Sequence, residues 1–254
     1  MQTDNRRLFL KVLTLTVLLT CLGILVYRTP NAVTVHAGQG NDRPPDISII
    51  PQPNSPLLIS SVKFDGTSHG QPEITFNITN VSGKSVSAYA IREDVRAGGR
   101  TRSSSLLFDL ELVDKVLSAG QSVTRADVFA PLAEEPNSLS LSVDYVEFSD
   151  GTMWGADSFR SAEQVAGERE SARLAISRLT EVLNTKGPSA VVEAVDSGFD
   201  SLMPPAGHSA RWVEGFNRGG RVMSARLKDA FRRGGASEVE RVLRQSSKTR
   251  KGGQ

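Results

Sequence analysis

Hydrophobic and polar residues alternate with a period of two through the middle of the chain, from residue 57 to residue 157. In one segment Ile74, Phe76 and Ile78 are separated by threonine and asparagine, the pattern of a strand with one buried and one exposed face. Asp150 and Gly151 supply a hairpin turn, because aspartate and glycine accept the positive φ angles that such turns need. About seven strands with regularly spaced turns predict an antiparallel two-sheet β-sandwich over residues 57–157.

The same alternation sets the expected limits of individual strands. One strand is predicted to include Phe108 and to continue through Leu110 and Leu112, and another is predicted over residues 123–129. The segment 96–100 holds two glycines, and it is expected to be a mobile loop between two strands.

After Asp157 the spacing of hydrophobic residues becomes that of an α-helix, so the fold class predicted for the chain is α+β. Gly187 and Pro188 are expected to end a first helix and to begin a second one, over residues 189–196. The first helix carries a hydrophobic stripe of four residues, Ala172, Ile176, Leu179 and Leu183.

A second hydrophobic stripe lies further along the C-terminal α-helical region, which is predicted to cover residues 158–245. Glycine pairs at 219–220 and 234–235 bracket this stripe, so we expect a separable helix that docks weakly on the rest. A last short helix is expected from Ser237, and residues 246–254 are predicted to be a disordered basic tail. The second stripe consists of Met223, Leu227, Ala230 and Phe231.

The N-terminal segment predicts a transmembrane or signal helix over residues 1–28. Residues 12–27 carry no charge and, with the apolar residues before them, approach the roughly 20 residues that span a bilayer. Because basic residues precede this run, the N-terminus is expected in the cytoplasm and the bulk of the chain outside it. A retained anchor is favoured over cleavage after Ala37, so the predicted location is inner-membrane-anchored or periplasmic. Residues 29–56, rich in proline and glycine, are expected to form an extended linker.

The basic flank of this segment resembles a twin-arginine export signal. Five residues carry the resemblance and form the predicted export signal: Arg6, Arg7, Phe9, Leu10 and Lys11. Such signals are addresses that a receptor reads. The resemblance implies a bacterial protein that is exported already folded, and it leaves open an exported enzyme or a cofactor-carrying protein.

Residues with catalytic or metal-binding chemistry are sparse. The only cysteine is Cys21, inside the apolar run, so disulfide frameworks, cysteine-ligated zinc and cysteine nucleophiles are excluded from the remainder. The three histidines, His36, His69 and His208, fall in a linker and in loops without metal-ligand spacing. The sequence therefore predicts no catalytic residues, no metal and no cofactor, and it favours a protein that is not an enzyme.

Positive charge is concentrated near the C-terminus, although the net charge of the whole chain is only +2. Residues 211–254 hold twelve Lys or Arg against four Asp or Glu. Such a face is a candidate contact for anionic lipid, an acidic polymer or a protein partner, whereas export makes nucleic acid an unsuitable partner. The candidate anion or partner contacts are Arg96, Arg100, Arg102, Arg221, Arg226, Lys228, Arg232 and Arg233.

The segments EITFNITNVSGKSVSAYAI and VDYVEFSDGTMWG resemble strand pairs of immunoglobulin-like or fibronectin-like modules of bacterial envelope proteins. The cysteine pair and intervening tryptophan of antibody domains are missing, and the family brings no fixed active site. The resemblance implies a binding or spacing module. The function predicted is therefore a membrane-tethered interaction or scaffold protein of the cell envelope with an envelope protein as partner, the alternative being the exported enzyme or cofactor carrier.

Overall fold

The computed structural model describes residues 45–65, 73–113, 115–128, 136–196 and 202–249. The chain divides into two units, residues 1–42 and 43–254, and the elements described below belong to the second unit. The predicted N-terminal helix and the five export-signal residues lie outside the described residues. Within the described residues, no helix has both the length and the apolar character that crossing a membrane requires.

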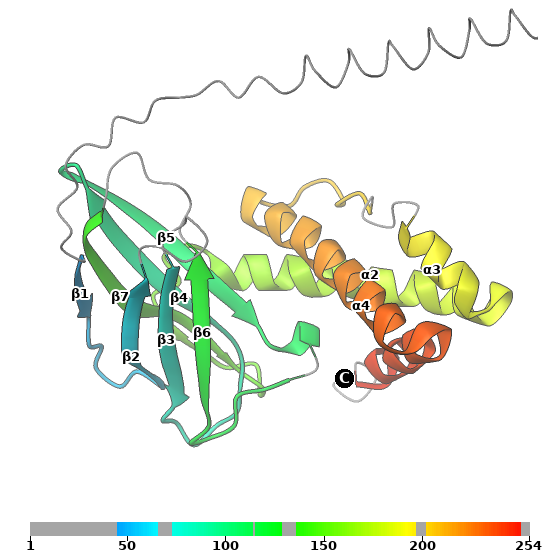
Figure 1. The fold of residues 1–254 in the computed structure, drawn as a ribbon, viewed down its shortest axis with the longest axis horizontal. Coiled ribbons are helices and arrows are strands. Elements are labelled where there is room, and N and C mark those ends of the chain that lie inside the picture. Colours follow the sequence, from blue (N-terminus) through cyan, green and yellow to red (C-terminus); the bar gives the residue numbers. More distant parts are fainter. Residues whose placement is uncertain (1–44, 66–72, 114, 129–135, 197–201, 250–254) are drawn as a thin grey trace, which may run out of the picture. The chain divides into compact units, whose positions relative to one another are not determined.

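The strands form two sheets (Figure 1). The smaller sheet has the order β2-β3-β6, and all its pairs are antiparallel. The larger sheet has the order β1-β7-β4-β5, with β8 also paired to β7. Its pairs are antiparallel except for the parallel pair β1–β7. The strands are β1 (Asp46–Ile49), β2 (Leu57–Asp65), β3 (Glu73–Asn80), β4 (Val86–Ala97), β5 (Arg100–Asp109), β6 (Ser122–Val128), β7 (Pro136–Phe148) and β8 (Met153–Gly155).

The two sheets share one hydrophobic core. The alternation in β3 gives a clear example, because Ile74, Phe76 and Ile78 are completely buried while the residues between them are only half-buried. Opposite them, Tyr89 and Ile91 of β4 are also completely buried in the same cluster. A period of two therefore separates core positions from outer positions, as the sequence predicted.

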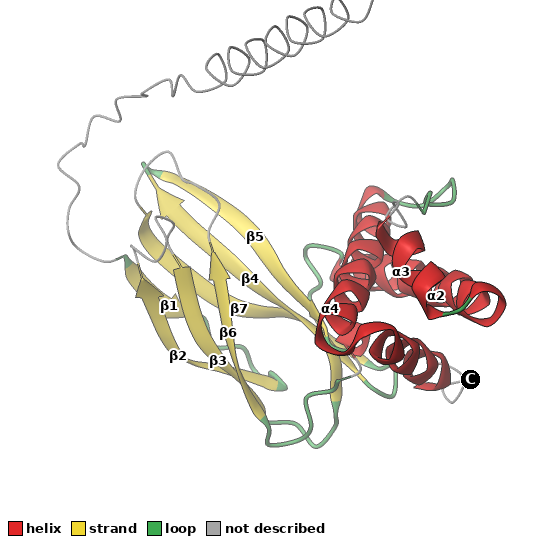
Figure 2. Ribbon diagram, turned by 45° about the vertical axis from the view of Figure 1, so that its right-hand side comes forward, coloured by secondary structure: helices red, strands yellow, loops and turns green. Residues whose placement is uncertain are grey.

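Three helices follow the sheets (Figure 2): α2 (Ser161–Lys186), α3 (Pro188–Asp196) and α4 (Ala210–Thr249). The α+β class predicted from the sequence is thus confirmed. Gly187 ends α2 with a φ of 84°, which glycine adopts easily, and Pro188 begins α3. The helices have their own core, in which both predicted stripes meet, including Leu179, Met223 and Leu227. The expectation that the second stripe docks weakly is wrong for Met223, Leu227 and Ala230, which are at most 1% exposed, whereas Phe231 is 43% exposed.

Several boundaries differ from those predicted. Strand β1 lies within the segment expected to be a linker, where a short alternating run stands between prolines. Strand β5 ends at Asp109, and Leu112 belongs to the short 3₁₀ helix η2 (Glu111–Val113) and to the helical core. Helix α4 continues beyond the expected start of a disordered tail and buries Ser246, which is 2% exposed.

The segment 96–100 is not a mobile loop but a tight hairpin. Ala97 pairs with Arg100, and only Gly98 and Gly99 form the turn, with φ angles of 56° and 75°. Positive φ at both central residues is the geometry of a type I′ turn, whose twist matches that of the flanking strands. The two glycines therefore connect β4 to β5 by a two-residue turn, with no longer loop between the strands.

Candidate functional site

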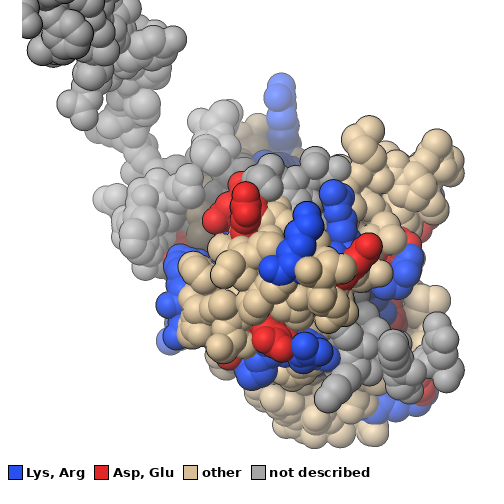
Figure 3. Space-filling model, turned by 90° about the vertical axis from the view of Figure 1, so that its right-hand side faces the viewer, with Lys and Arg blue, Asp and Glu red and all other residues tan. Residues whose placement is uncertain are grey.

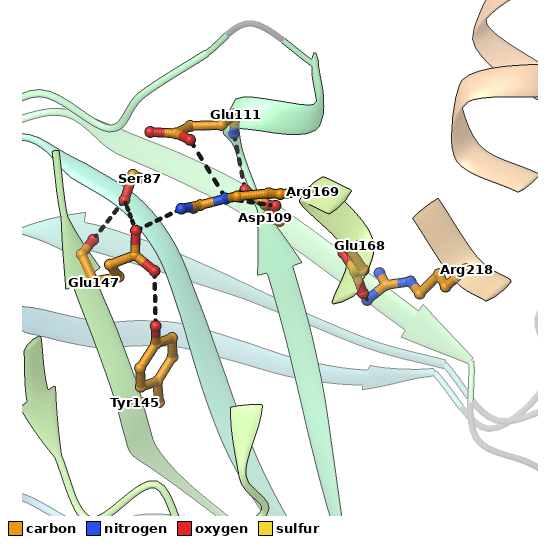
Figure 4. A network of polar contacts seen from close by, with 8 residues as sticks. All are labelled: Ser87, Asp109, Glu111, Tyr145, Glu147, Glu168, Arg169 and Arg218. Carbon is orange, nitrogen blue, oxygen red and sulfur yellow. Dashed lines mark hydrogen bonds and ion pairs between the residues drawn. The ribbon is translucent and has the colours of Figure 1, made fainter. Parts of the chain in front are cut away.

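A cluster of buried charges joins the larger sheet to α2 (Figure 4). Arg169 of α2 lies between Asp109, at the end of β5, and Glu147 of β7. Its Nε is 3.0 Å from Asp109 Oδ2, and its Nη1 is 2.6 Å from Glu147 Oε1. Glu111 Oε2 is 3.3 Å from the same Nε. The side chain of Asp109 is 0% exposed and that of Glu147 only 15%, so solvent screens these pairs little.

Hydrogen bonds complete the surroundings of both carboxylates. Ser87 Oγ donates to Glu147 Oε1 at 3.1 Å, and the Tyr145 hydroxyl donates to Glu147 Oε2 at 2.8 Å. Burial raises the pKa of Asp109, and the hydrogen bonds and charge of Arg169 only partly oppose this effect. Burial opposes the charge of Arg169, but Asp109 and Glu147 outweigh it and raise the pKa of the guanidinium. Arg169 therefore stays charged between two carboxylates.

The neighbouring residue on α2 makes a second buried pair. Glu168 Oε1 is 2.8 Å from Arg218 Nη1 of α4, and the Glu168 side chain is 0% exposed. Arg218 Nη2 also donates to the backbone carbonyl of Leu107 in β5 at 3.0 Å. Burial raises the pKa of Glu168 to about 7, although Arg218 lowers it in part. Two consecutive residues of α2 thus connect to different elements, Arg169 to the sheet and Glu168 to α4.

Glycines let α2 and α4 touch backbone to backbone at this point. A Cβ at Gly219 would lie 2.2 Å from the Glu168 carbonyl oxygen, and one at Gly215 would lie 2.0 Å from that of Gln164. On the other helix, a Cβ at Gly167 would lie 2.1 Å from the Trp212 carbonyl oxygen. Gly219 is therefore required for close packing, and the expectation that residues 219–220 separate a mobile helix is wrong.

The charged cluster is built to hold elements together. Asp109 is fully buried, and its carboxylate is engaged by Arg169 and by the backbone N–H of Glu111 at 3.1 Å. A carboxylate so placed stabilises a buried cation. Within the described ranges, no group of three or more His, Cys, Asp or Glu is arranged to hold a metal ion.

The outer faces of the two sheets differ. Only part of that of the larger sheet is covered by α2: Ala88, Ala90 and Tyr145 pack against Val165 and partly buried Ala162, whereas Arg96 and Thr101 on the same face are exposed. That of the smaller sheet is at least partly open to solvent, with Leu58 53% exposed. We call its uncharged central part the outer-sheet patch, which comprises Leu58, Ser60, Thr75, Asn77, Thr79, Ser122, Thr124 and Ala126.

The outer-sheet patch is ordered by hydrogen bonds between its own side chains. Thr124 Oγ1 donates to Asn77 Oδ1 at 2.8 Å, and the hydroxyls of Thr79 and Ser122 are 2.7 Å apart. Charged residues border it at one end, where Lys63 pairs with Thr75 and the next position of β3 on this face is Glu73. The patch is thus a surface of hydroxyl, amide and methyl groups.

The hairpin arginines Arg96, Arg100 and Arg102, predicted as anion or partner contacts, do not converge. Opposite residues of antiparallel strands point to one side. Arg102 is opposite Val95 and Arg100 is opposite Ala97, whereas Arg96 is opposite Thr101 and so points to the other face. The β4–β5 hairpin therefore separates Arg96 from the other two arginines.

The predicted basic residues of α4 also have different surroundings. Arg226 donates to the backbone carbonyl of Leu112 at 3.0 Å, and Arg233 is 3.0 Å from Asp229. Lys228 and Arg232 border an apolar pocket, and Arg221 is exposed. Figure 3, which faces the helical end of the unit, shows basic side chains interspersed with acidic ones. Helix α4 therefore does not present a surface whose charges all have the same sign.

Sequence reasoning missed the charged cluster and the outer-sheet patch. Asp109, Glu147 and Arg169 are far apart in the sequence, and each looks like an ordinary polar position of a strand or helix. A signal did exist for the patch, because the alternate positions of β3 from Thr75 to Thr79 are uncharged. It could be recognised only once β2 and β6 were known to be its neighbours.

No protein-family model matches the chain, and no curated protein matches it. Among solved structures, one similar chain is a hypothetical protein from Peptoclostridium difficile 630. It is 14% identical with a TM-score of 0.29, over 43% of this chain and 90% of that one. Another is a target of the Northeast Structural Genomics Consortium, 7% identical with a TM-score of 0.27, over 39% of this chain and 79% of that one. Similarity this low carries no argument about fold or function.

Proposed function

We propose that the chain is a membrane-tethered, exported interaction or scaffold protein of the cell envelope that does not catalyse a reaction. Residues 1–28 would anchor it, with the basic flank in the cytoplasm and residues 43–254 on the far side of the inner membrane. The uncharged run and the positive residues before it support this topology.

The two sheets are proposed to be an immunoglobulin-like β-sandwich. The shared core and the antiparallel pairing of most strands support this interpretation. The alternating segments that resemble envelope modules fall on β3, β4, β7 and β8. Modules of this architecture commonly present a sheet face or a loop to a partner.

The outer-sheet patch is the observation that carries the proposal of a protein partner. Protein interfaces are depleted of charge at their centre, and the patch places Thr124 and Asn77 at the centre of an uncharged face. Leu58 and Val81, 53% and 57% exposed, add apolar area near one end. Because α2 already covers part of the outer face of the larger sheet, we propose that the open face of the smaller sheet is the one that docks.

The buried charges give the unit the stiffness that a scaffold needs. Arg169 connects α2 to two strands of the larger sheet, and Glu168 connects it to Arg218 of α4. A partner bound on the smaller sheet would therefore be held in a fixed position relative to the helices.

A topology experiment tests the membrane assignment. Protease added to spheroplasts should digest residues 43–254, and the protein should fractionate with membranes. Protection of this unit in intact spheroplasts, with digestion only after lysis, would refute the proposed topology.

A capture experiment tests the docking face. Thr124→Arg places a charge at the centre of the outer-sheet patch, on a residue that is already exposed. Thr101→Arg is the matched control, because Thr101 is also an exposed strand threonine but lies on β5 of the larger sheet. Capture from envelope extract should lose its specific partner with Thr124→Arg and keep it with Thr101→Arg. Equal capture by both variants would exclude this face.

The exported enzyme or cofactor carrier remains the second candidate, because the residues Arg6, Arg7 and Lys11 resemble a route that carries folded proteins. Metal analysis and an absorption spectrum of protein purified from its own membranes discriminate between the two. A stoichiometric metal or a coloured cofactor would favour the second candidate.

A further inference from the structure

An apolar pocket opens between α3 and α4, on the helical side of the unit. Its volume is about 370 Å³, near the lower end of the roughly 300–1,000 Å³ typical of small-molecule sites. The wall from α3 contains Val191, Val192 and Val195, and the wall from α4 contains Leu227, Phe231 and Val239. Phe231 is 43% exposed, whereas most of the other wall residues are buried. The pocket therefore has a hydrophobic interior, and the ring of Phe231 at its wall is partly exposed to water.

A break in α4 creates the pocket. Gly234 and Gly235 have non-helical angles, and the φ of 64° and ψ of −154° at Gly235 suit glycine alone. Figure 1 shows α4 turning where its colour changes from orange to red. Because of this turn, Val239 reaches the same pocket as Leu227, which precedes the break. Three helical segments, α3 and the two parts of α4, thus line the pocket.

Two cations border the pocket and hold only weak ion pairs. Lys228 Nζ is 3.5 Å from Asp196 Oδ1, and Arg232 Nη2 is 3.7 Å from Asp229 Oδ1. The side chains of Lys228 and Arg232 are 44% and 75% exposed, and pairs so long and exposed contribute little free energy. Among the residues that line the pocket, Asp196 is the acidic one. The two cations, Lys228 and Arg232, therefore leave the border of the pocket with an excess of positive charge. Asp229 also keeps a shorter pair, at 3.0 Å, with Arg233.

We infer that this pocket binds a single-chain amphiphile with an anionic head group, namely a long-chain free fatty acid. The alkyl chain fills the valine-lined interior, and each CH₂ that it buries leaves water. The carboxylate lies at the border, where Lys228 and Arg232 turn from their weak pairs to donate charge-assisted hydrogen bonds. The volume suits one alkyl chain and not the two of a phospholipid. This site is independent of the outer-sheet patch, so either proposal can fail alone.

Photolabelling of the full chain in nanodiscs of neutral phosphatidylcholine tests the inference. The probe is a palmitate analogue with a diazirine on its alkyl chain, and labelled peptides are mapped by mass spectrometry. We expect labelling on α3 and on the α4 segment around Phe231, and competition by unmodified palmitate. The double variant Lys228→Gln/Arg232→Gln should lower labelling at least tenfold, while a matching hexadecanol probe, which lacks the charge, should label both proteins alike.

The control variant is Arg221→Gln/Arg241→Gln, which removes two exposed α4 arginines that do not line the pocket. It should label like the unchanged protein, and Phe231→Ser should lower labelling by both probes. Three results would overturn the inference: label confined to other elements, equal loss in the control, or labelling of these peptides by a photoactivatable phosphatidylglycerol but not by the palmitate probe. Circular dichroism confirms that the exposed-site variants remain folded.

Discussion

Replacing Arg169 with methionine is the most informative test of how sheets and helices are joined. The substitution keeps an unbranched apolar stem but removes the guanidinium, so Asp109 and Glu147 face each other without a cation. Removing one partner of a buried ion pair costs roughly 3–5 kcal/mol. The Arg169 side chain is 25% exposed, so we expect the lower end, about 3 kcal/mol.

This loss can be measured by urea denaturation or as a fall in melting temperature. A loss of 1 kcal/mol lowers Tm by roughly 2–4 °C in a domain of this size, so Arg169→Met should melt about 6–12 °C lower. Adding Asp109→Asn should recover part of the loss, because it removes one of the two uncompensated carboxylates. The deficit should also shrink in acid, where Asp109, whose pKa burial raises, becomes protonated.

Arg173→Met is the matched control for the same helix. Arg173 pairs with Glu170 at 2.6 Å, but its side chain is 57% exposed, and pairs of this type are worth about 0.3–0.5 kcal/mol. If Arg169→Met and Arg173→Met destabilise the protein equally, the charged cluster contributes no more than a surface pair, and the proposed role of the junction is wrong.

Three further predictions concern other parts of the chain. Burial, and then the charge of Asp127, raise the pKa of Glu93 to about 7, so the folded state keeps a proton that the unfolded chain releases above a pKa of about 4.3. The unchanged protein should therefore lose stability as pH rises from about 4.3 to 7. Compared with it, Glu93→Gln should be more stable by up to about 3 kcal/mol at pH 8 and equally stable at pH 4, as measured by urea denaturation midpoints. Stability profiles of the two proteins that run parallel with pH would contradict this prediction. Gly219→Ala should cost about 1–3 kcal/mol by pushing α4 from the Glu168 carbonyl, whereas Gly220→Ala, whose nearest neighbour would be Ser171 Oγ at 3.2 Å, should cost less in the same denaturation assay. Replacing Arg6 and Arg7 with lysine keeps their charge and should abolish export, assayed by cell fractionation, if a receptor reads their guanidinium groups.

Local patterns were sufficient to predict most of the strands and helices. Alternation identified the buried side of β3, and Gly187 with Pro188 marked the boundary between α2 and α3, because both signals depend on neighbouring residues alone. Strand β1 escaped notice because a four-residue strand in a segment between two prolines resembles a linker, and its partner β7 lies about ninety residues away along the chain.

The joint between sheets and helices could not be predicted from the same patterns. Asp109 and Glu147 occupy alternating polar positions, and alternation cannot distinguish a face open to water from one covered by a charged helix. Gly219 posed a similar problem, since glycine permits both a hinge and a close helix crossing. Only the short distance between Gly219 and the Glu168 carbonyl shows that this glycine serves a close crossing of α2 and α4 and not a hinge.

The central claim, that the outer-sheet patch docks an envelope protein, is tested most directly by a photo-crosslinking amino acid placed at Thr124 in living cells. Our account predicts a discrete adduct of higher mass from Thr124, its loss when Asn77→Arg is added beside it, and no adduct from the same amino acid at Thr101. Absence of an adduct at Thr124, or equal adducts at both positions, would contradict the account.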